Sequence, residues 1–252
     1  MNIARNAILA AGCLLAAMTA NGAEQQPGNR KIGYEIGLGF NIGAMSPLGL
    51  PAEIRKIDSY QPKANLSIDF AVSYMLSDKW GIGAGLCFET KGMKTGVEVK
   101  DYHLKMNIEE GDEQGTRTGY FTGRIKNDTR VTYITIPVNA VFRPDNDWKV
   151  EAGPYFSIAI DRSFLGDVSS GKMRETPLHP AIGISKASYD YSDDIRHFDF
   201  GIGLGGSRRI YRGLSVRADL KWGLLTVLDP SKRTIDMDTY NIYLNLGLSY
   251  AF

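Results

Sequence analysis

One stretch of the sequence has the glycine spacing of a phosphate-binding turn. GIGLGG at residues 201–206 fits the G-x-G-x-x-G pattern, whose glycines let the backbone approach a dinucleotide pyrophosphate. Such a turn needs a strand before the glycines and a helix after them. Here apolar residues alternate from Phe198 to Leu204 straight through the motif, and the short basic turn SRRIYRG follows. The pattern therefore predicts a β-strand in which Gly201, Gly203 and Gly205 share one face and make space for larger side chains.

Histidine is the other residue type that could carry catalysis. His103, His179 and His197 each lie in or beside a long polar segment, and their spacing singles out no catalytic triad. No cluster of His, Cys and Asp has the spacing of a zinc site. We therefore expect no catalytic, cofactor-binding or metal-binding residues, and we expect that the protein is not an enzyme.

Charged residues recur on the polar side of alternating segments. They are Glu35, Asp69, Glu89, Lys91, Lys149, Glu151, Asp161, Asp199, Arg217, Asp219 and Lys221. Acids and bases are both present, so these side chains could pair with one another or line a pore. If they face the inside of a narrow barrel, which side chains just fill, the expected result is an internal ion-pair network that closes the lumen.

The elements that position these charges are strands with two different faces. Apolar residues occupy every second position in eight segments, which indicates β-strands. The segments are 32–42, 64–76, 80–91, 132–142, 148–161, 197–207, 214–225 and 239–252. Each is about the 9–11 residues with which a tilted strand crosses a bilayer. No stretch after the N-terminal region approaches the ~20 apolar residues of a spanning helix.

The connections between the segments alternate in length. Three are short and polar, whereas the connections at 44–63, 92–131, 162–196 and 226–238 are longer. Short periplasmic turns and long outer loops are typical of outer-membrane barrels. We therefore predict an eight-stranded antiparallel up-and-down transmembrane β-barrel, in the cell outer membrane of a Gram-negative bacterium.

The alternative is a soluble barrel with its apolar face inward. Its outer face would then carry Gly33, Gly37, Gly81 and Gly83, although glycine weakens a strand and offers nothing to water. Glycines fit better on the inside of a narrow barrel, where small residues leave room for large ones. Aromatic residues also gather near both ends of the apolar face, as in the girdles at bilayer interfaces. Both observations favour the membrane barrel.

The N-terminus predicts export. A single charge, Arg5, precedes an apolar run from Ala7 to Ala20, which is followed by small residues suitable for cleavage. We predict a signal peptide over 1–23, with cleavage after Gly22 as the alternative, a short N-terminal segment over 24–30 and the barrel domain over 31–252. The 29 basic and 28 acidic residues nearly balance, so we expect no nucleic-acid partner.

The strand motifs resemble a known family. The last strand, NIYLNLGLSYAF, looks like the C-terminal signature of outer-membrane barrels, which implies that Phe252, Tyr250 and Leu248 are recognised by the barrel-assembly machinery. FETKGMK, YITIPVNAVFRP, GPYFSIAI, FDFGIGLGG and LSVRADLKWGL, in this order, resemble the PorT-like outer-membrane barrel family over most of 31–252. One member of that family is linked to type IX protein secretion, but no catalytic or binding motif carries that role to this chain.

The long outer loops are the expected functional surface. Weak alternation at 95–108 and 118–134 predicts that the third and fourth strands continue above the membrane as a hairpin; a separate spanning strand at 95–108 is the alternative. We expect a structural or interaction role, with the lipid bilayer and an unknown protein or ligand at the outer loops as partners. A secretion-accessory or small transport component is the leading alternative, and an enzyme at the outer rim is the third.

Overall fold

The computed structural model describes residues 31–49, 51–108, 115–176, 178–231 and 238–252. These belong to one compact unit, Lys31–Phe252. The predicted signal peptide at 1–23 and the segment 24–30 lie outside the described residues. Among the residues that are described, no helix has the length and apolar character needed to cross a membrane.

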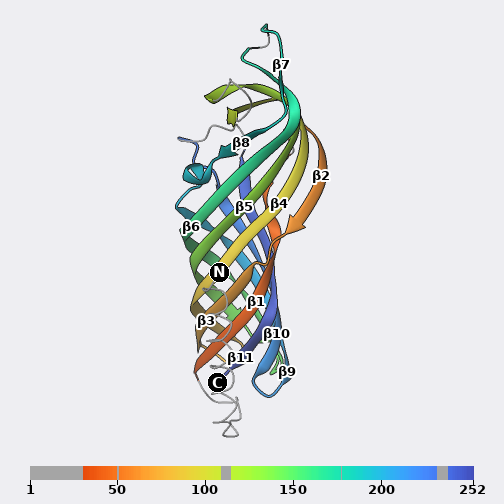
Figure 1. The fold of residues 1–252 in the computed structure, drawn as a ribbon. Helices are drawn as coiled ribbons and strands as arrows, with labels where there is room; N and C mark the ends of the chain where they lie inside the picture. Colours follow the sequence, from red (N-terminus) through yellow and green to blue (C-terminus); the bar gives the residue numbers. More distant parts are fainter. Residues whose placement is uncertain (1–30, 50, 109–114, 177, 232–237) are drawn as a thin grey trace. The chain divides into compact units, whose positions relative to one another are not determined.

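Eight strands form a closed antiparallel ring (Figure 1). Each strand pairs with its neighbours in chain order, and pairing from Glu35–Ala251 to Pro47–Thr239 joins the first strand to the last. The ring consists of β1 (Ile32–Pro47), β3 (Leu66–Met75), β4 (Trp80–Ile108), β5 (Gly115–Phe142), β6 (Trp148–Arg174), β9 (Phe198–Tyr211), β10 (Leu214–Thr226) and β11 (Thr239–Ala251). The predicted eight-stranded antiparallel barrel is therefore confirmed.

The apolar face of the ring points outward. Leu38 pairs with Ile68, Ile68 with Phe88 and Phe88 with Ile134, so apolar side chains continue from strand to strand around the ring. Leu38 and Phe88 remain about half exposed, as expected for residues that face lipid rather than a protein core. At the level of the short turns, the Trp80 ring packs 4.6 Å from that of Phe142, measured between centroids.

Three strands extend well beyond the apolar, outward-facing band of the ring, which we call the belt. β4 and β5 stay paired from Trp80–Phe142 to Ile108–Gly115, and β5 pairs with β6 as far as Tyr120–Arg174. Figure 1 shows these strands continuing together beyond the rest of the ring. The predicted hairpin extension is confirmed, and 95–108 is not a separate spanning strand. The prediction that 162–196 is only a loop is wrong, because β6 runs on to Arg174 and the short strands β7 (Ile182–Ile184) and β8 (Ala187–Asp190) pair with it.

Polarity inverts above the belt. On β4, Lys94, Glu98 and Lys100 point outward and are exposed, whereas Val99 is buried inside. The outer parts of the strands thus follow the rule for proteins in water, with an apolar interior. The buried residues of this interior, called the outer core below, include Tyr102, Leu104, Met106, Phe121, Ile125, Phe164, Val168, Met173, Tyr189, Tyr191, Ile195 and Leu228.

Two irregularities shift which residues face inward. On β4 the register shifts between Val99 and Tyr102, where Asp101 has a positive φ of 52°. On β6 one extra residue lies between the partners of Thr132 and Tyr133. Because a one-residue shift exchanges the two faces of a strand, Asp161 is exposed. Its predicted place in the lumen is therefore wrong.

A gap in backbone pairing lies beside the outer core. The strand β2 (Ile54–Pro62) pairs with β4 directly above the top of β3, and pairing of β1 with β3 ends at Phe40–Leu66. In the described ranges, no strand pairing joins β2 to the upper end of β1. Instead the Tyr60 hydroxyl donates a hydrogen bond to the Gly43 carbonyl. We call this boundary the β1–β2 seam.

We predict that a charge on the belt impairs insertion. Leu204 faces outward on β9 with 58% of its surface exposed, so Leu204→Lys places an ammonium group in lipid at a cost of about 2–4 kcal/mol near the midplane. Leu165→Lys is the matched control, because Leu165 is 46% exposed but lies above the belt on β6. Folding yield in lipid vesicles, measured by gel mobility with and without heating, should fall only for the first variant. Equal yields for the two variants would contradict the conclusion that Leu204 faces lipid.

A second prediction concerns the seam and pH. Burial raises the pKa of the Tyr60 hydroxyl above its ordinary value near 10. The protonated hydroxyl is the donor to Gly43, so this bond is present at and below the ordinary pKa and is lost as the pH rises through the raised one. A spin label at Ser59→Cys should therefore gain mobility in alkaline buffer, and in Tyr60→Phe it should be mobile already at neutral pH.

Tyr211→Phe is the control for this experiment, because Tyr211 is an exposed tyrosine at the other end of the ring. It should leave label mobility unchanged at every pH. A label that is equally mobile in the wild type and in Tyr60→Phe would contradict the closing role of Tyr60.

Candidate functional site in the barrel lumen

Six of the predicted lumen charges form two ion-pair groups near the short-turn end of the barrel. The Lys149 Nζ lies 2.6 Å from Glu35 Oε2 and 3.0 Å from Glu151 Oε2. The Arg217 guanidinium lies 2.6 Å from Asp69 Oδ2 and 2.7 Å from Asp219 Oδ2. In each group one cation lies between two carboxylates, so each of these four carboxylates has a cationic partner.

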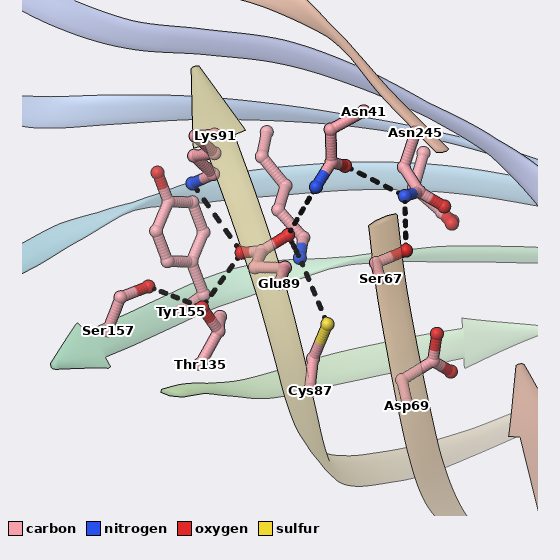
Figure 2. Close-up of polar contacts among 12 residues, drawn as sticks. Asn41, Ser67, Asp69, Cys87, Glu89, Lys91, Thr135, Tyr155, Ser157 and Asn245 are labelled. Carbon is pink, nitrogen blue, oxygen red and sulfur yellow. Dashed lines mark hydrogen bonds and ion pairs between the residues drawn. The ribbon is translucent and has the colours of Figure 1, made fainter. Parts of the chain in front are cut away.

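A third group surrounds Glu89, which is fully buried (Figure 2). The Lys221 Nζ lies 2.8 Å from Glu89 Oε2, and the Thr135 hydroxyl donates to Oε1 over 2.8 Å. The Lys91 Nζ lies 3.5 Å from Oε1. A buried carboxylate is tolerated when it is paired and hydrogen-bonded, and here two ammonium groups share one acid.

Lys91 is also enclosed by aromatic rings. Its Nζ lies 5.0 Å from the ring centroid of Tyr133, 5.4 Å from that of Tyr155 and 5.7 Å from that of Tyr243. Lys91 has no exposed surface, and within the described residues its Nζ has no hydrogen-bond acceptor. Its charge is therefore stabilised by Glu89 and by the faces of three rings.

Neutral polar residues complete this level of the lumen. The Asn245 Nδ2 donates to Asn41 Oδ1 over 2.7 Å and to Ser67 Oγ over 2.6 Å, and Asn41 Nδ2 donates to Glu89 Oε2 over 3.4 Å. Figure 2 shows these bonds running from Ser67 through Asn245 and Asn41 to Glu89. We call the set Asn41, Ser67, Glu89, Lys91, Thr135, Tyr133, Tyr155, Lys221, Tyr243 and Asn245 the polar layer. Nearly all of it is buried, so side chains fill the lumen at this level.

Asp199 contacts the edge of the polar layer. Its Oδ2 accepts hydrogen bonds from Tyr155, at 3.3 Å, and from Asn241, at 3.0 Å. Both donors are neutral, which separates Asp199 from the three ion-pair groups. The structure thus places all the predicted lumen charges except Asp161 inside the ring, but in distinct groups rather than in one continuous network.

Glycines on the inner face accommodate the large side chains. A Cβ atom on Gly37 would lie 2.6 Å from the Asp69 carboxylate, and one on Gly201 would lie 2.6 Å from the Tyr155 hydroxyl. Gly205 likewise faces Asp219. The GIGLGG segment therefore lies within strand β9, where its first and third glycines leave room for Tyr155 and Asp219, as predicted.

The sequence pattern did not single out Asn41, Asn245 and Tyr133 as site residues. The first two lie at inward positions of the alternation, so their face was readable from the sequence. Tyr133 adjoins the register shift on β6, and which residues meet across the lumen depends on the shear of the ring. The sequence contains no signal for that choice.

The structure does not bring the three histidines together. The His103 ring packs 5.2 Å from Tyr120, His179 contacts the Thr176 hydroxyl at 2.6 Å, and the His197 Nδ1 lies 3.5 Å from Arg162. Over the part of the chain that the structure describes, no group of His, Cys, Asp and Glu is arranged to hold a metal ion.

The C-terminal residues follow the outward alternation of β11. Leu248 is 48% exposed, and the rings of Tyr250 and Phe252 meet edge to face at 5.4 Å. The backbone N–H of Phe252 donates to the Tyr34 carbonyl and so ties the terminus to β1. Recognition of these residues by the assembly machinery stays a prediction.

A closed antiparallel ring with an apolar outer belt and a filled polar lumen defines a transmembrane β-barrel of the outer membrane. The family model described as "Outer membrane protein beta-barrel domain" matches residues 20–229. The chain belongs to this family, and its location is the outer membrane of a Gram-negative bacterium. No curated protein matches the sequence.

Several solved outer-membrane proteins are similar in fold. Ail, the attachment invasion locus protein of Yersinia pestis, is 12% identical over 88% of this chain and 97% of its own, with a TM-score of 0.36. The outer membrane protease OmpT from Escherichia coli is 13% identical over 92% and 99%, with a TM-score of 0.35. A major outer membrane protein from Thermus thermophilus is 14% identical over 88% and 100%, with a TM-score of 0.36.

We predict that the polar layer contributes strongly to stability. Lys221→Met removes the nearer of the two cations beside Glu89 and leaves a buried carboxylate short of a partner, which should cost about 3–5 kcal/mol in the free energy of unfolding. Denaturant titration of the protein in detergent, followed by gel mobility, measures this loss. Combining Lys221→Met with Glu89→Gln and Lys91→Met should restore part of it, because no charge of this group is then buried without a counter-ion.

Lys79→Met provides the control, because Lys79 is an exposed residue in a short turn. Its free energy of unfolding should stay within about 0.5 kcal/mol of the wild type. If Lys221→Met behaves like Lys79→Met, the pairing of Lys221 with Glu89 does not stabilise the barrel.

Proposed function

We propose that this protein is a closed, non-enzymatic outer-membrane barrel whose outer body, the parts of β4, β5 and β6 above the belt together with the outer core, is a binding surface for another macromolecule. The observation that carries the proposal is the outer core. β4, β5 and β6 continue well past the belt and enclose their own apolar interior. A strand needs only about 9–11 residues to cross the bilayer, so spanning alone does not account for strands of 27–29 residues.

The lumen supports a role outside the barrel rather than through it. The polar layer fills the lumen with buried side chains, and a small cavity of about 80 Å³ lies among the charges Glu35, Asp69, Lys149 and Arg217. A pore needs a continuous water-filled path, which the buried Glu89 and the tyrosines around Lys91 obstruct.

The outer surface of the extended strands is polar and carries both signs of charge. Arg124, Lys126 and Arg130 on β5 are exposed, as are Glu98 and Lys100 on β4. Rigid strands hold these side chains at fixed positions, which suits specific recognition of a protein or a glycan better than a flexible loop does. The proposal assigns recognition to this face.

The leading alternative is an accessory role in protein secretion. The order of the strand motifs resembles the PorT-like family, one member of which is linked to type IX secretion. This alternative predicts that the partner at the outer face is a component of a secretion apparatus. An enzyme at the outer rim is the weaker alternative, because His103, His179 and His197 each contact a different neighbour and share no common site.

We predict that the wild-type barrel does not conduct ions. In planar bilayers it should show no resolvable current steps, because the polar layer closes the lumen. A variant with Tyr155→Ala and Tyr243→Ala, which removes two of the rings around Lys91, should show small steps once it is inserted. Steps of similar size in both proteins would contradict the closed lumen and favour transport.

A pull-down after crosslinking in intact outer membranes tests the binding surface. Arg124→Glu combined with Lys126→Glu reverses two exposed charges on β5 and should abolish capture of a partner that recognises this face. Lys79→Glu, a charge reversal in a turn at the opposite end of the ring, serves as the control and should retain capture. If the reversed variant keeps every crosslinked partner, the proposed surface is wrong.

A further inference from the structure

The outer core contains a cavity that packing does not fill. Its volume is about 230 Å³, and it lies among the upper end of β1, strand β2 and the outer parts of β4 and β5. Most of its wall is apolar and includes Ile54, Ile57, Met93, Val97, Val99 and Ile125. Protein interiors normally leave few voids larger than a water molecule, so a space of this size is unusual for a folded core.

Three polar side chains in the wall, Tyr189, Asn127 and Thr95, are bonded to one another. The Tyr189 hydroxyl donates to Asn127 Oδ1, and the Asn127 Nδ2 donates to Thr95 Oγ1 over 3.4 Å. These contacts use the polar atoms of Asn127 within the wall itself. A cavity walled in this way favours an apolar occupant over water, because water needs two to four polar partners.

The β1–β2 seam provides a route into the cavity. Ile57 is 50% exposed and Tyr60 is 43% exposed, although both also line the cavity. Apolar side chains therefore run from the cavity to the surface across this boundary. Only the Tyr60 hydroxyl bond to Gly43, rather than a ladder of backbone bonds, is described between the two strands.

The seam opens next to lipid. It begins directly above Leu66, the outward-facing first residue of β3, which is 40% exposed on the belt. The ten residues of β3 match the length that crosses a bilayer, so the seam lies at the outer boundary of the hydrocarbon layer. Ile57 and Tyr60, which line the cavity and are half exposed, lie at this boundary on the way from the outer leaflet to the cavity.

We propose that the cavity binds a single hydrocarbon chain, taken in from the outer leaflet through the β1–β2 seam. The chain belongs to a free fatty acid or is one acyl chain of a leaflet lipid. A dry apolar cavity of about 150 Å³ already binds benzene, and the larger space here accepts a slender chain segment but not a pair of chains. This site is separate from the polar outer face of β5, so it stands independently of the proposed binding of a macromolecule.

Photocrosslinking tests the proposal. The purified protein in phosphatidylcholine nanodiscs is exposed to palmitic acid that carries a diazirine near its methyl end, and labelled peptides are identified by mass spectrometry. We expect labels at inward residues of 93–102 and at Ile125, in addition to labels on the belt. Unlabelled palmitate should compete for the inner sites only.

A second probe separates the two sources of the chain. Phosphatidylcholine with the same diazirine on one acyl chain replaces the fatty acid. Inner labels from the fatty acid alone assign the site to free fatty acids, whereas inner labels from the phospholipid assign it to leaflet lipids. If both probes label only the belt, which serves as the internal positive control, the proposal is wrong.

Two matched pairs of variants locate the binding site. Val97→Phe fills part of the cavity. It should lower inner labelling roughly fivefold or more, because the larger ring occupies space that the hydrocarbon chain needs. Glu98→Phe introduces the same residue on the outward side of β4 and should leave labelling unchanged. Gel mobility with and without heating confirms that each variant is folded.

The entrance to the cavity at the β1–β2 seam is tested with substitutions that leave the outer core unchanged. Ile57→Asp places a charge at the half-exposed entrance and should lower inner labelling, whereas Gln61→Asp on the same strand, which does not line the cavity, should not. Inner labelling that persists unchanged in both Val97→Phe and Ile57→Asp would overturn the proposal, whatever the belt shows.

Discussion

Backbone hydrogen bonding in lipid is the constraint on which this structure depends. A strand in the bilayer has no water to satisfy its N–H and C=O groups, so every strand needs two partners and the sheet has to close. Pairing of β1 with β11 supplies that closure. Once the ring is closed with eight strands, it is narrow, and everything that points inward competes for one small space. The glycines, the tyrosines and the buried charges of the lumen follow from that limit.

Within the lumen, charge pairing and steric fit act together. Lys149 and Arg217 each lie between two carboxylates, and the fully buried Glu89 contacts two cations in the polar layer. Gly37 and Gly201 leave the room that Asp69 and Tyr155 occupy. Because buried charges are costly when a partner is missing, this interior is more constrained than an apolar filling of the same volume. A filled, constrained lumen is consistent with the proposed binding function at the outer end of the barrel.

Above the membrane, the same strands meet a different solvent and their polarity inverts. Lys94 and Glu98 face water where Leu86 and Phe88 face lipid, and the interior changes from charged to apolar. Strand β2 covers part of this outer core but leaves the seam with β1 closed by a side-chain bond. The cavity behind the seam thus lies where the two environments meet, which gives the outer body both a polar face toward water and an apolar entrance toward lipid.

Alternation, loop lengths and glycine placement are local properties, and they were enough to predict the eight strands, their faces and the outward direction of the apolar belt. They also placed Glu35, Arg217 and Lys221 inside. They failed at Asp161, because a single extra residue in β6 exchanges the faces, and period-two patterns do not reveal where such a residue falls. The extension of β6 to Arg174 was missed for a different reason, because the inversion of polarity above the belt weakens the pattern. Only the tertiary structure decided which inward residues meet, such as Lys91 with three tyrosines, and where a cavity stays open, because both depend on the register and shear between strands rather than on any one strand.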